Sequence, residues 1–284
     1  MRFWTRLGFR KRGTGQRAEI RKKYQGIDPL LSGQGSDIGR ARETNEDAFL
    51  SLKSLIRTEH EFRAAGLFIV ADGMGGHSKG EEASRLATRT AGALIVRDIL
   101  MPVPTGSDWD VVNRPIHEIL VEATMSANQA VSRIGSDAGT TLTSVLVLGH
   151  SAYVAHVGDT RVYYLDDGGL QQITQDHSLA SRLAELGRIS ALEAQQHPQR
   201  NVLYRALGQG PELKVDTHFQ RLKSDSHVIL CSDGLWNAVS EDEIVKVIRT
   251  STTPQEACNW LIDRANEEGG EDNITVVLAR VNYS

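Results

Sequence analysis

Four aspartates of this chain each stand where a strand-like apolar run meets a polar loop, and each has a glycine or an acid beside it. They are Asp72, Asp159, Asp233 and Asp272. The first follows the run at 68–71, and the last opens onto the run at 274–278. A single Asp-Gly pair is a common turn sequence and would carry little weight. The repetition predicts a sheet protein whose strand ends carry carboxylates.

Carboxylates that converge from several strand ends need a counter-charge. Like charges a few ångströms apart raise each other's pKa, so the group cannot stay fully ionised alone. Oxygen ligands of this type suit the hard divalent cations Mg²⁺ and Mn²⁺. The glycines beside the acids allow close backbone approach and leave their carbonyls available. The pattern therefore favours a metal centre, with an ordinary turn at each position as the alternative.

Composition narrows the classes of protein that fit. The chain has 284 residues, 40% of them hydrophobic, which is enough for one large globular domain or two small ones. The formal net charge of -4 does not suggest general nucleic-acid binding. Two cysteines, Cys231 and Cys258, exclude a disulfide framework and a thiolate zinc cluster. We find neither an apolar run of transmembrane length nor a signal peptide, and expect a cytoplasmic protein.

Residues 1–31 differ from the rest and are predicted to form a basic, flexible N-terminal tail ahead of a catalytic domain at 32–284. Nine Arg and Lys residues stand against the single acid Glu19 within residues 1–27. Four apolar side chains are interleaved: Phe3, Trp4, Leu7 and Phe9. One interpretation is a solvated tail. The other is a segment that contacts an anionic membrane or an acidic partner.

The order of the predicted elements indicates the fold class. We expect a strand, a polar turn and a second strand within Gly33–Leu52, a charged connector at Lys53–Arg63, and a strand at Gly66–Ala71. Helices follow a capping-box pattern at Ser78 and a proline at Pro115. Further strands are predicted at Gly139–Val147, Ala152–Val157, Arg161–Leu165, Lys214–Phe219, His227–Cys231 and Asn273–Val281. Tight turns between short strands favour antiparallel pairing.

The second half adds an insert and two more helices. Gln175–Gly208 breaks the strand pattern and is predicted to be a partly helical insert over the sheet edge. Ser240 and Thr253 are predicted N-caps of the last two helices. Strands and helices are segregated in the sequence, which predicts an α+β fold of two packed antiparallel sheets with helices outside.

Seven motifs in a fixed order give the chain a family resemblance over residues 32–281. They are Arg42-x-x-x-Glu46-Asp47, Ala71-Asp72-Gly73-Met74-Gly75-Gly76-His77, Gly139-Thr140-Thr141, Val157-Gly158-Asp159-Thr160-Arg161, Thr174-Gln175-Asp176-His177-Ser178, Ser232-Asp233-Gly234-Leu235 and Asp272-Asn273-Ile274-Thr275. With these residues the sequence resembles the metal-dependent serine/threonine protein phosphatases of type 2C, the PPM family, in its bacterial branch.

The resemblance implies a four-layer α/β/β/α sandwich with two antiparallel sheets, helix pairs outside them, and a two-metal centre of Mn²⁺ or Mg²⁺. It implies that Asp72 bridges both ions, that the Gly73 carbonyl binds one ion, and that Asp233 and Asp272 bind the other. Two further acids would hold metal-bound waters, Glu46 and Asp47. Asp159 together with Asp233 matches a weaker third site of many relatives.

The implied reaction is hydrolysis of phosphoserine and phosphothreonine in proteins. Two cations lower the pKa of a bridging water, so that hydroxide attacks phosphorus and no phosphoenzyme forms. Arg42, four residues before Glu46, matches the phosphate-binding arginine and can grip phosphoryl oxygens in a bidentate way. Arg40 is its competitor for that role. Where eukaryotic relatives have a histidine, this chain has Met74, which leaves the general acid open between His77 and a metal-bound water.

Two other functions remain open at this stage. One is a pseudo-enzyme that binds phosphoproteins without turnover, and the other is a hydrolase of small phosphoesters or nucleotides. A Cys-x5-Arg spacing from Cys258 to Arg264 fits cysteine-dependent phosphatases, but it lies in a predicted amphipathic helix and lacks a small-residue phosphate loop. The expected partners are a phosphoprotein substrate and a Ser/Thr kinase that the enzyme opposes. A monomer is expected.

Overall fold

The structure, a computed structural model, describes residues 28–57, 62–75, 79–101 and 114–282. The predictions for the basic tail before residue 28, for Ser78 and for His77 lie outside these ranges. The strand β1 begins at Leu30, two residues inside the segment assigned to the tail.

Two antiparallel sheets form the centre of the molecule. The first has the strand order β1-β11-β10-β7-β8, and the second has the order β2-β3-β5-β6-β9, with β4 paired to β3. The bounds of the strands are β1 Leu30–Asp37, β2 Asp47–Arg57, β3 Phe62–Met74, β4 Gly139–Thr140, β5 Leu142–Leu148, β6 Ser151–Val157, β7 Arg161–Asp166, β8 Gly169–Gln172, β9 Asp216–Arg221, β10 His227–Cys231 and β11 Ile274–Val281.

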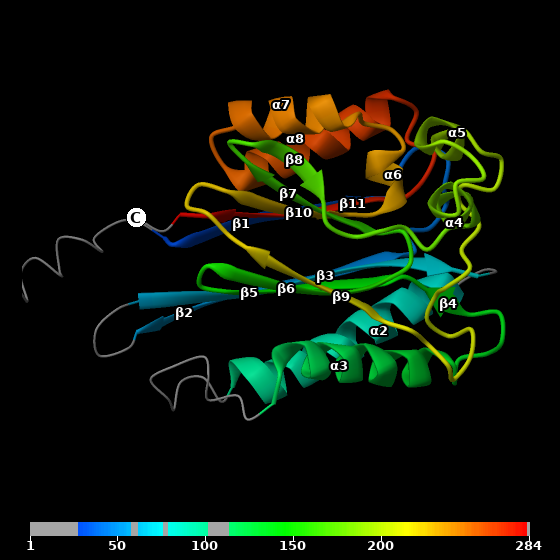
Figure 1. The fold of residues 1–284 in the computed structure, drawn as a ribbon, viewed down its shortest axis with the longest axis horizontal. Coiled ribbons are helices and arrows are strands. Elements are labelled where there is room, and N and C mark those ends of the chain that lie inside the picture. The colour runs from blue at the N-terminus through cyan, green and yellow to red at the C-terminus, as the bar shows by residue number, and fades with distance from the viewer. Residues whose placement is uncertain (1–27, 58–61, 76–78, 102–113, 283–284) are drawn as a thin grey trace, which may run out of the picture.

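Helices cover the outer face of each sheet, as Figure 1 shows. The helices α2 and α3 lie on the β2-β3-β5-β6-β9 sheet, and α7 and α8 lie on the other sheet. The bounds are α2 Lys79–Ile95, continued by the π-helical turn η1 Val96–Leu100, α3 Ile116–Val131, α4 Leu179–Glu185, α5 Ala191–Gln195, α6 Asp233–Trp236, α7 Glu241–Thr250 and α8 Pro254–Glu267. The predicted four-layer α/β/β/α sandwich is confirmed.

Alternation of side chains along the strands builds three separate apolar cores. On β3, Leu67 and Ile69 face α2 and α3, whereas Phe68 and Val70 face the opposite sheet. Successive side chains of a strand point to opposite faces, so a sheet buried on both sides needs an unbroken apolar run. On β10, Ile229 contributes in the same way to the core beneath α7 and α8.

The helix starts follow the predicted caps. The Ser240 hydroxyl accepts a hydrogen bond from the Glu243 amide at the start of α7, and Thr253 accepts one from Glu256 at the start of α8. Each bond satisfies an amide that has no partner within the helix. The predicted connector at Lys53–Arg63 was too long, because β2 continues to Arg57 and pairs with β3 over its whole length. Cross-strand pairing there outweighs the charged composition.

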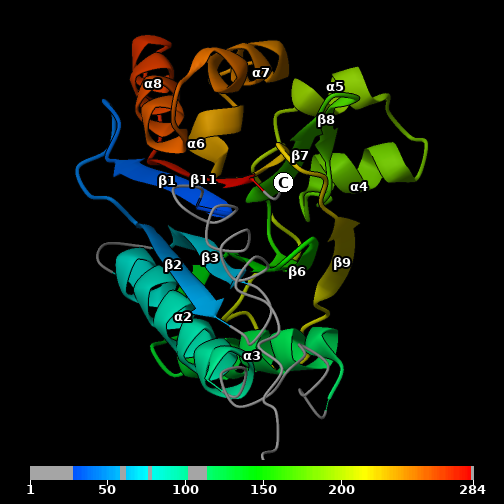
Figure 2. The ribbon, with the colours of Figure 1, turned by 90° about the vertical axis from the view of Figure 1, so that its left-hand side faces the viewer.

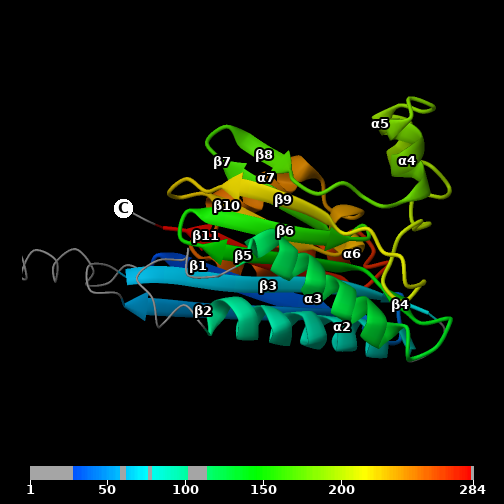
Figure 3. The same cartoon turned by 60° about the horizontal axis from the view of Figure 1, so that its bottom comes forward.

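The insert at 175–208 stands at one end of the sandwich. Figures 1 and 3 show α4 and α5 beyond the strand ends, and Figure 2, which looks along the strands, shows them on the side of β8. The Ser178 side chain caps α4 and the Ser190–Glu193 capping box starts α5. Gly187 follows α4 with a φ of 65°, a left-handed value that favours glycine, as the predicted helix stop requires. The strand ends at this side of the sandwich carry the acids.

Candidate metal centre

The predicted acids come from both sheets and lie where strands of the two sheets end. Asp47 opens β2 and is the direct register partner of Asp72 near the end of β3. Asp233 opens α6 directly after β10, and Asp272 precedes β11 in the other sheet. Asp159 follows β6. The structure therefore brings together carboxylates that are up to about two hundred residues apart in sequence.

Backbone hydrogen bonds fix Asp72. Its amide donates to the Thr141 hydroxyl at 2.8 Å, and its carbonyl accepts from the Thr141 amide and the Thr140 hydroxyl, both at 2.9 Å. The carbonyl is thus already used within the protein. Burial, and then the charges of Asp47 and Asp233, raise the pKa of Asp72 well above its ordinary value. An acid in this setting needs a proton or a cation.

The glycines beside the acids are required by space. A Cβ on Gly73 would lie 2.2 Å from the Gly80 carbonyl oxygen and 2.6 Å from that of Glu46. A Cβ on Gly234 would lie 2.2 Å from the carbonyl oxygen of Asn273. Both separations are far below van der Waals contact, so only glycine permits the backbones to come this close. The Asp-Gly repeats therefore reflect close packing of the loops around the acids.

The two carboxylate oxygens of Asp47 have different surroundings. Its Oδ2 accepts a hydrogen bond from the Ser232 hydroxyl at 2.8 Å. Its Oδ1 is buried and has no hydrogen-bond partner among the described residues. Burial raises the pKa of Asp47 to about 7, against the opposing hydrogen bonds of Thr275 and Ser232. A buried, unpartnered carboxylate oxygen is costly, and a cation or a water held by one would satisfy it.

Asp233 and Asp159 are the most buried acids of the group, with 7% and 4% of their surface exposed. Burial, and then the charge of Asp272, raise the pKa of Asp233 to about 6. Burial, and then the charge of Asp233, raise the pKa of Asp159 well above its ordinary value. Asp233 Oδ1 is a second buried carboxylate oxygen without a partner in the described chain. The two orphaned oxygens lie on acids of opposite sheets.

Arg42 and Asp272 form an ion pair at the rim of the group. Arg42 Nη2 lies 2.6 Å from Asp272 Oδ2, and the arginine side chain is half exposed. The hydrogen bond to Asp272 raises the pKa of Arg42, and the charges of Glu46 and Asp72 add to the effect. The guanidinium is therefore beside the acids and open to solvent. The competitor Arg40 instead donates its backbone amide to the Gly270 carbonyl.

One asparagine organises the loop that carries Glu46. Asn273 Nδ2 donates to the carbonyl oxygens of Ile38 and Thr44, and its Oδ1 accepts from the Glu46 amide at 2.8 Å. Glu46 in turn accepts from the Gly73 amide through its carbonyl oxygen. Burial raises the pKa of the Glu46 carboxyl. The sequence placed Asn273 in a motif but gave it no role.

These residues fit hard divalent cations. Their donors are carboxylate oxygens, two of them buried and unpartnered. Burial first, and then mutual repulsion, raises the pKa values of Asp72 and Asp233, and a cation would offset both effects. Within the described ranges, no three Asp, Glu, His or Cys side chains lie close enough together to hold a metal ion as they stand. Asp272 is turned toward Arg42 instead. The charge of that guanidinium offsets one of the acids.

A second ion pair, which sequence reasoning left without a role, supports the Asp159 loop. Arg161 donates to both carboxylate oxygens of Asp176, and its guanidinium lies 3.7 Å from the ring centroid of Trp236. The Trp236 indole donates to the Asp159 carbonyl at 3.1 Å. The only sequence signal was that Arg161 belongs to the same motif as Asp159, and Asp176 to the motif that follows it in the sequence. Their bidentate pairing ties the insert to the loop.

His177 joins the same loop to the far end of the insert. Its Nδ1 accepts from the Gly158 amide at 3.0 Å, which leaves the proton on Nε2, 3.1 Å from Asp216. Arg205, at the far end of the insert, lies 2.9 Å from both His177 Nε2 and Asp216 Oδ1. Burial lowers the pKa of His177, so the imidazole is neutral at neutral pH. The histidine is a structural link here.

The cysteine alternative is contradicted by burial. Cys258 is completely buried in α8, and burial raises the pKa of its thiol to about 12. Cys231 is equally buried, and burial raises its thiol pKa to about 12 as well. Neither thiol can form a thiolate nucleophile at neutral pH.

Met74 occupies the position of the histidine of eukaryotic relatives. It is half-buried, and its sulfur contacts the Gln209 side-chain amide. A thioether has no proton to donate, so Met74 cannot act as a general acid.

Comparison with known families identifies the class. Residues 31–274 match the family described as Protein phosphatase 2C. The serine/threonine phosphatase stp of Listeria innocua is 35% identical over 248 residues, which span 87% of this chain and 94% of that protein. The chain belongs to the protein phosphatase 2C family and is therefore an enzyme of the protein phosphatase class.

Solved structures agree with this assignment. The serine/threonine phosphatase PstP/Ppp of Mycobacterium tuberculosis is 33% identical, with a TM-score of 0.73 over 89% of this chain and 99% of that one. The catalytic domain of PstP in complex with two manganese ions is 32% identical, with a TM-score of 0.71 over the same shares. The family is metal dependent, and that relative holds two Mn²⁺ ions.

Proposed function

We propose that this protein phosphatase removes phosphate from phosphoserine and phosphothreonine side chains of proteins, in one step and without a phosphoenzyme, and that it opposes a Ser/Thr kinase. The observation that carries the proposal is the group of acids from two sheets with buried, unpartnered oxygens on Asp47 and Asp233. Such a group has no purely structural explanation, because repulsion and burial both act against it.

Two Mn²⁺ or Mg²⁺ ions would be held by this group, and when bound they supply hydroxide near neutral pH by lowering the pKa of a water. We assign Asp72 and the Gly73 carbonyl to the pair of ions, with Asp233 and Asp272 on the other sheet. Glu46 and Asp47 would hold waters on the ions. Asp159 would add a third, weaker position together with Asp233. Asp47 and Asp72 are register partners on β2 and β3, which supports the assignment of both acids to the same ions.

Arg42 is assigned to the substrate phosphate. Its guanidinium is half exposed beside Asp272 and presents several N–H donors in one plane. A phosphoryl group at the rim would compete with Asp272 for these donors, and a cation on Asp272 would favour that exchange. Fixed positive charge then meets the charge that develops on the phosphoryl oxygens. Met74 cannot donate a proton, so another group must protonate the leaving oxygen.

The insert supports a macromolecular substrate. The helices α4 and α5 stand beyond the strand ends, on the side where the acids lie. Their attachment through Arg161, Asp176 and His177 fixes the insert next to the Asp159 loop. Exposed side chains of the insert, such as Leu186 and Leu192, are available for contact with a protein chain. A small phosphoester would need no such surface.

Hydrolysis of a phosphothreonine peptide tests the proposal. The wild-type chain is assayed with Mn²⁺ and with EDTA, beside Asp233→Ala and a control, Asp167→Ala, in the exposed β7–β8 turn. We expect Mn²⁺-dependent phosphate release by the wild type and the control, and none by Asp233→Ala. Full activity of Asp233→Ala would refute the metal assignment. Tight phosphopeptide binding without release would indicate a binding protein, and faster release from nucleotides would indicate a small-molecule hydrolase.

A further inference from the structure

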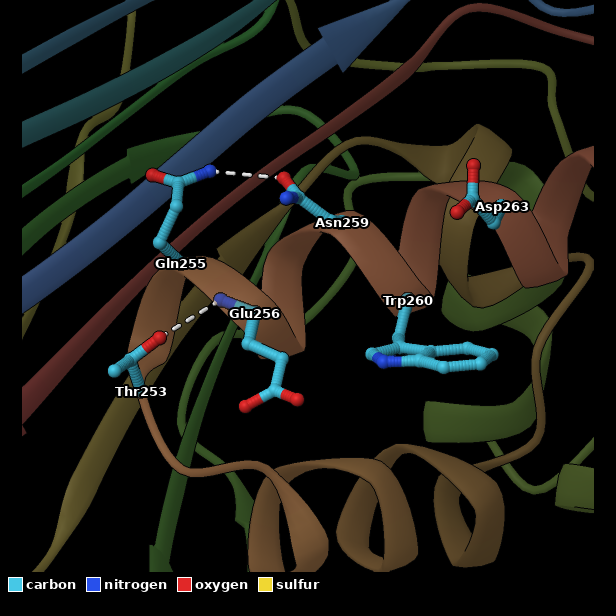
Figure 4. A pocket seen from close by; sticks show the side chains of 6 residues that line it. All are labelled: Thr253, Gln255, Glu256, Asn259, Trp260 and Asp263. Carbon is cyan, nitrogen blue, oxygen red and sulfur yellow. Dashed lines mark hydrogen bonds between the residues drawn. The ribbon is translucent and has the colours of Figure 1, made fainter.

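A groove between α7 and α8 lies on the outer layer of the molecule, and the function proposed above does not use it. Figure 4 shows Trp260 and Glu256 projecting from α8 into this groove, above the coil of α7. The groove has a volume of about 450 Å³. Trp260 is 60% exposed, which is unusual for the largest apolar side chain. We refer to this feature as the α7–α8 groove.

The rim of the α7–α8 groove is acidic. Four acids line it: Glu243, Glu256, Asp263 and Glu267. Of the two basic lining residues, Arg264 is already held by Glu243 at 2.9 Å and by Glu267 at 3.1 Å. Lys246 is the other. Glu256 and Asp263 form no ion pair within the described residues. An exposed indole beside these carboxylates is suited to a segment that carries both cations and apolar side chains.

The first 27 residues of this chain have that chemistry. They hold nine Arg and Lys residues and one acid, whereas the whole chain has 32 basic and 36 acidic residues. The remainder therefore has 23 basic and 35 acidic residues, so its formal net charge is negative whereas that of the first 27 residues is positive. The first twelve residues combine five cations with Phe3, Trp4, Leu7 and Phe9. Lysine and arginine over an indole face are attracted by its quadrupole.

The attachment point of the tail lies beside the groove. Gln255, which lines the α8 end of the surface drawn in Figure 4, exchanges two backbone-to-side-chain hydrogen bonds with Gln34 of β1. A Cβ on Gly33 would lie 2.3 Å from the Gln255 amide nitrogen. The fifteen residues between Arg12 and the described chain can span up to about 50 Å when extended. The helix α8 has 14 residues and is about 21 Å long.

We propose that the basic N-terminal segment, residues 1–27, binds in the α7–α8 groove of its own chain. Its apolar side chains would contact Trp260, and its cations would contact Glu256, Asp263 and Glu267. A short tether raises the effective concentration of the segment to the millimolar range, so weak contacts suffice. A second copy of the chain or an anionic membrane offers the same charge sign, but neither has this tether to favour it.

A fluorescence experiment on the full chain tests this binding. Bimane, which tryptophan quenches on contact, is attached to Gly8→Cys in a Trp4→Phe background. The native Cys231 and Cys258 are fully buried and do not compete for the label. We expect a several-fold rise in emission in Trp260→Phe, which removes the quencher, and at about 1 M NaCl, which screens the ion pairs. Phosphatase turnover should be unchanged in Trp260→Phe.

Charge reversal provides the second arm and its matched control. Asp263→Lys with Glu267→Lys should raise emission as salt does. Glu118→Lys with Glu122→Lys makes the same change in net charge on the exposed face of α3, on the opposite layer, and should leave emission unchanged.

Four results would overturn the proposal. The first is emission that neither Trp260→Phe nor salt alters. The second is quenching that disappears on dilution of the protein, which would assign the groove to the tail of a second copy. The third is a label that becomes shielded only when phosphatidylserine vesicles are added, which would make the tail a membrane segment. An equal response of the α3 control would reduce the effect to net charge and would overturn it too.

Discussion

Replacing Asp233 by asparagine is expected to stabilise the metal-free protein. Asp233 is 7% exposed, its Oδ1 has no partner among the described residues, and burial followed by the charge of Asp272 raises its pKa from 3.8 to about 6. At neutral pH the folded state must therefore hold a charge that it disfavours. Asparagine keeps the shape and removes the charge.

The size of the effect follows from the pKa. A rise of about two units corresponds to up to about 3 kcal/mol of destabilisation at pH 7.5, where the carboxyl is ionised both folded and unfolded. The raised pKa means that the folded state binds more protons than the unfolded state, so the wild type gains stability as the pH falls through 6. The advantage of asparagine should therefore be full above pH 6 and vanish near pH 4.

Thermal unfolding in EDTA measures this. About 3 kcal/mol corresponds to a rise in Tm of roughly 6–12 °C for a domain of this size. In excess Mn²⁺ the order should reverse, because only the wild type binds the ions well and is stabilised by mass action. The control is Asp176→Asn, which leaves the nearly buried Arg161 without its carboxylate and should lower Tm in both buffers.

The refuting result is specific. If Asp233→Asn in EDTA at pH 7.5 unfolds at or below the wild-type temperature, burial and the neighbouring Asp272 do not disfavour the ionised Asp233 as the structure implies. The acids would then lack the electrostatic penalty that a bound cation would relieve. A gain in stability that persists unchanged at pH 4 would point to packing as the cause, because the wild-type carboxyl is then protonated.

Two further predictions concern the rim and the loops. Arg42→Ala should raise KM for a phosphopeptide about ten-fold or more while kcat changes less, since a charged hydrogen bond contributes about 1.5–3 kcal/mol; steady-state kinetics with an unchanged KM would contradict its role in substrate binding. Asn273→Ala removes three hydrogen bonds and should cost about 3 kcal/mol. Denaturant unfolding tests this, with the exposed Asn259→Ala expected to cost under about 0.5 kcal/mol.

Much of the fold was predictable because local patterns agree with the tertiary arrangement. The apolar run at 68–71 is a strand buried on both faces, and the caps at Ser240 and Thr253 start α7 and α8. The prediction of a connector at Lys53–Arg63 was wrong at its start, because the charged residues there were interpreted as a loop. In that stretch β2 gains its stability from pairing with β3. The short strand β8 at 169–172 was also missed, since four residues give almost no periodicity.

The candidate site was predictable in its members and unpredictable in its connections. Asp72, Asp233 and Asp272 could be identified from strand ends with adjacent glycines or acids. The hydrogen bond from Ser232 to Asp47, and those from Asn273 to the Glu46 loop, join residues about 185 and 227 positions apart. No periodicity or cap spans such a distance. These contacts exist only after the two sheets have packed.

The sequence by itself determined most of the strands and helices, the candidate residues of the site, and the family to which the chain belongs. Only the tertiary structure decided that β1 and β2, neighbours in the chain, enter opposite sheets, and that β1 pairs with the last strand, β11. The physical reason is that each sheet closes through long-range pairing and burial, which local sequence does not encode. That packing encloses the acids, raises their pKa values, and leaves two of their oxygens without a partner in the described protein.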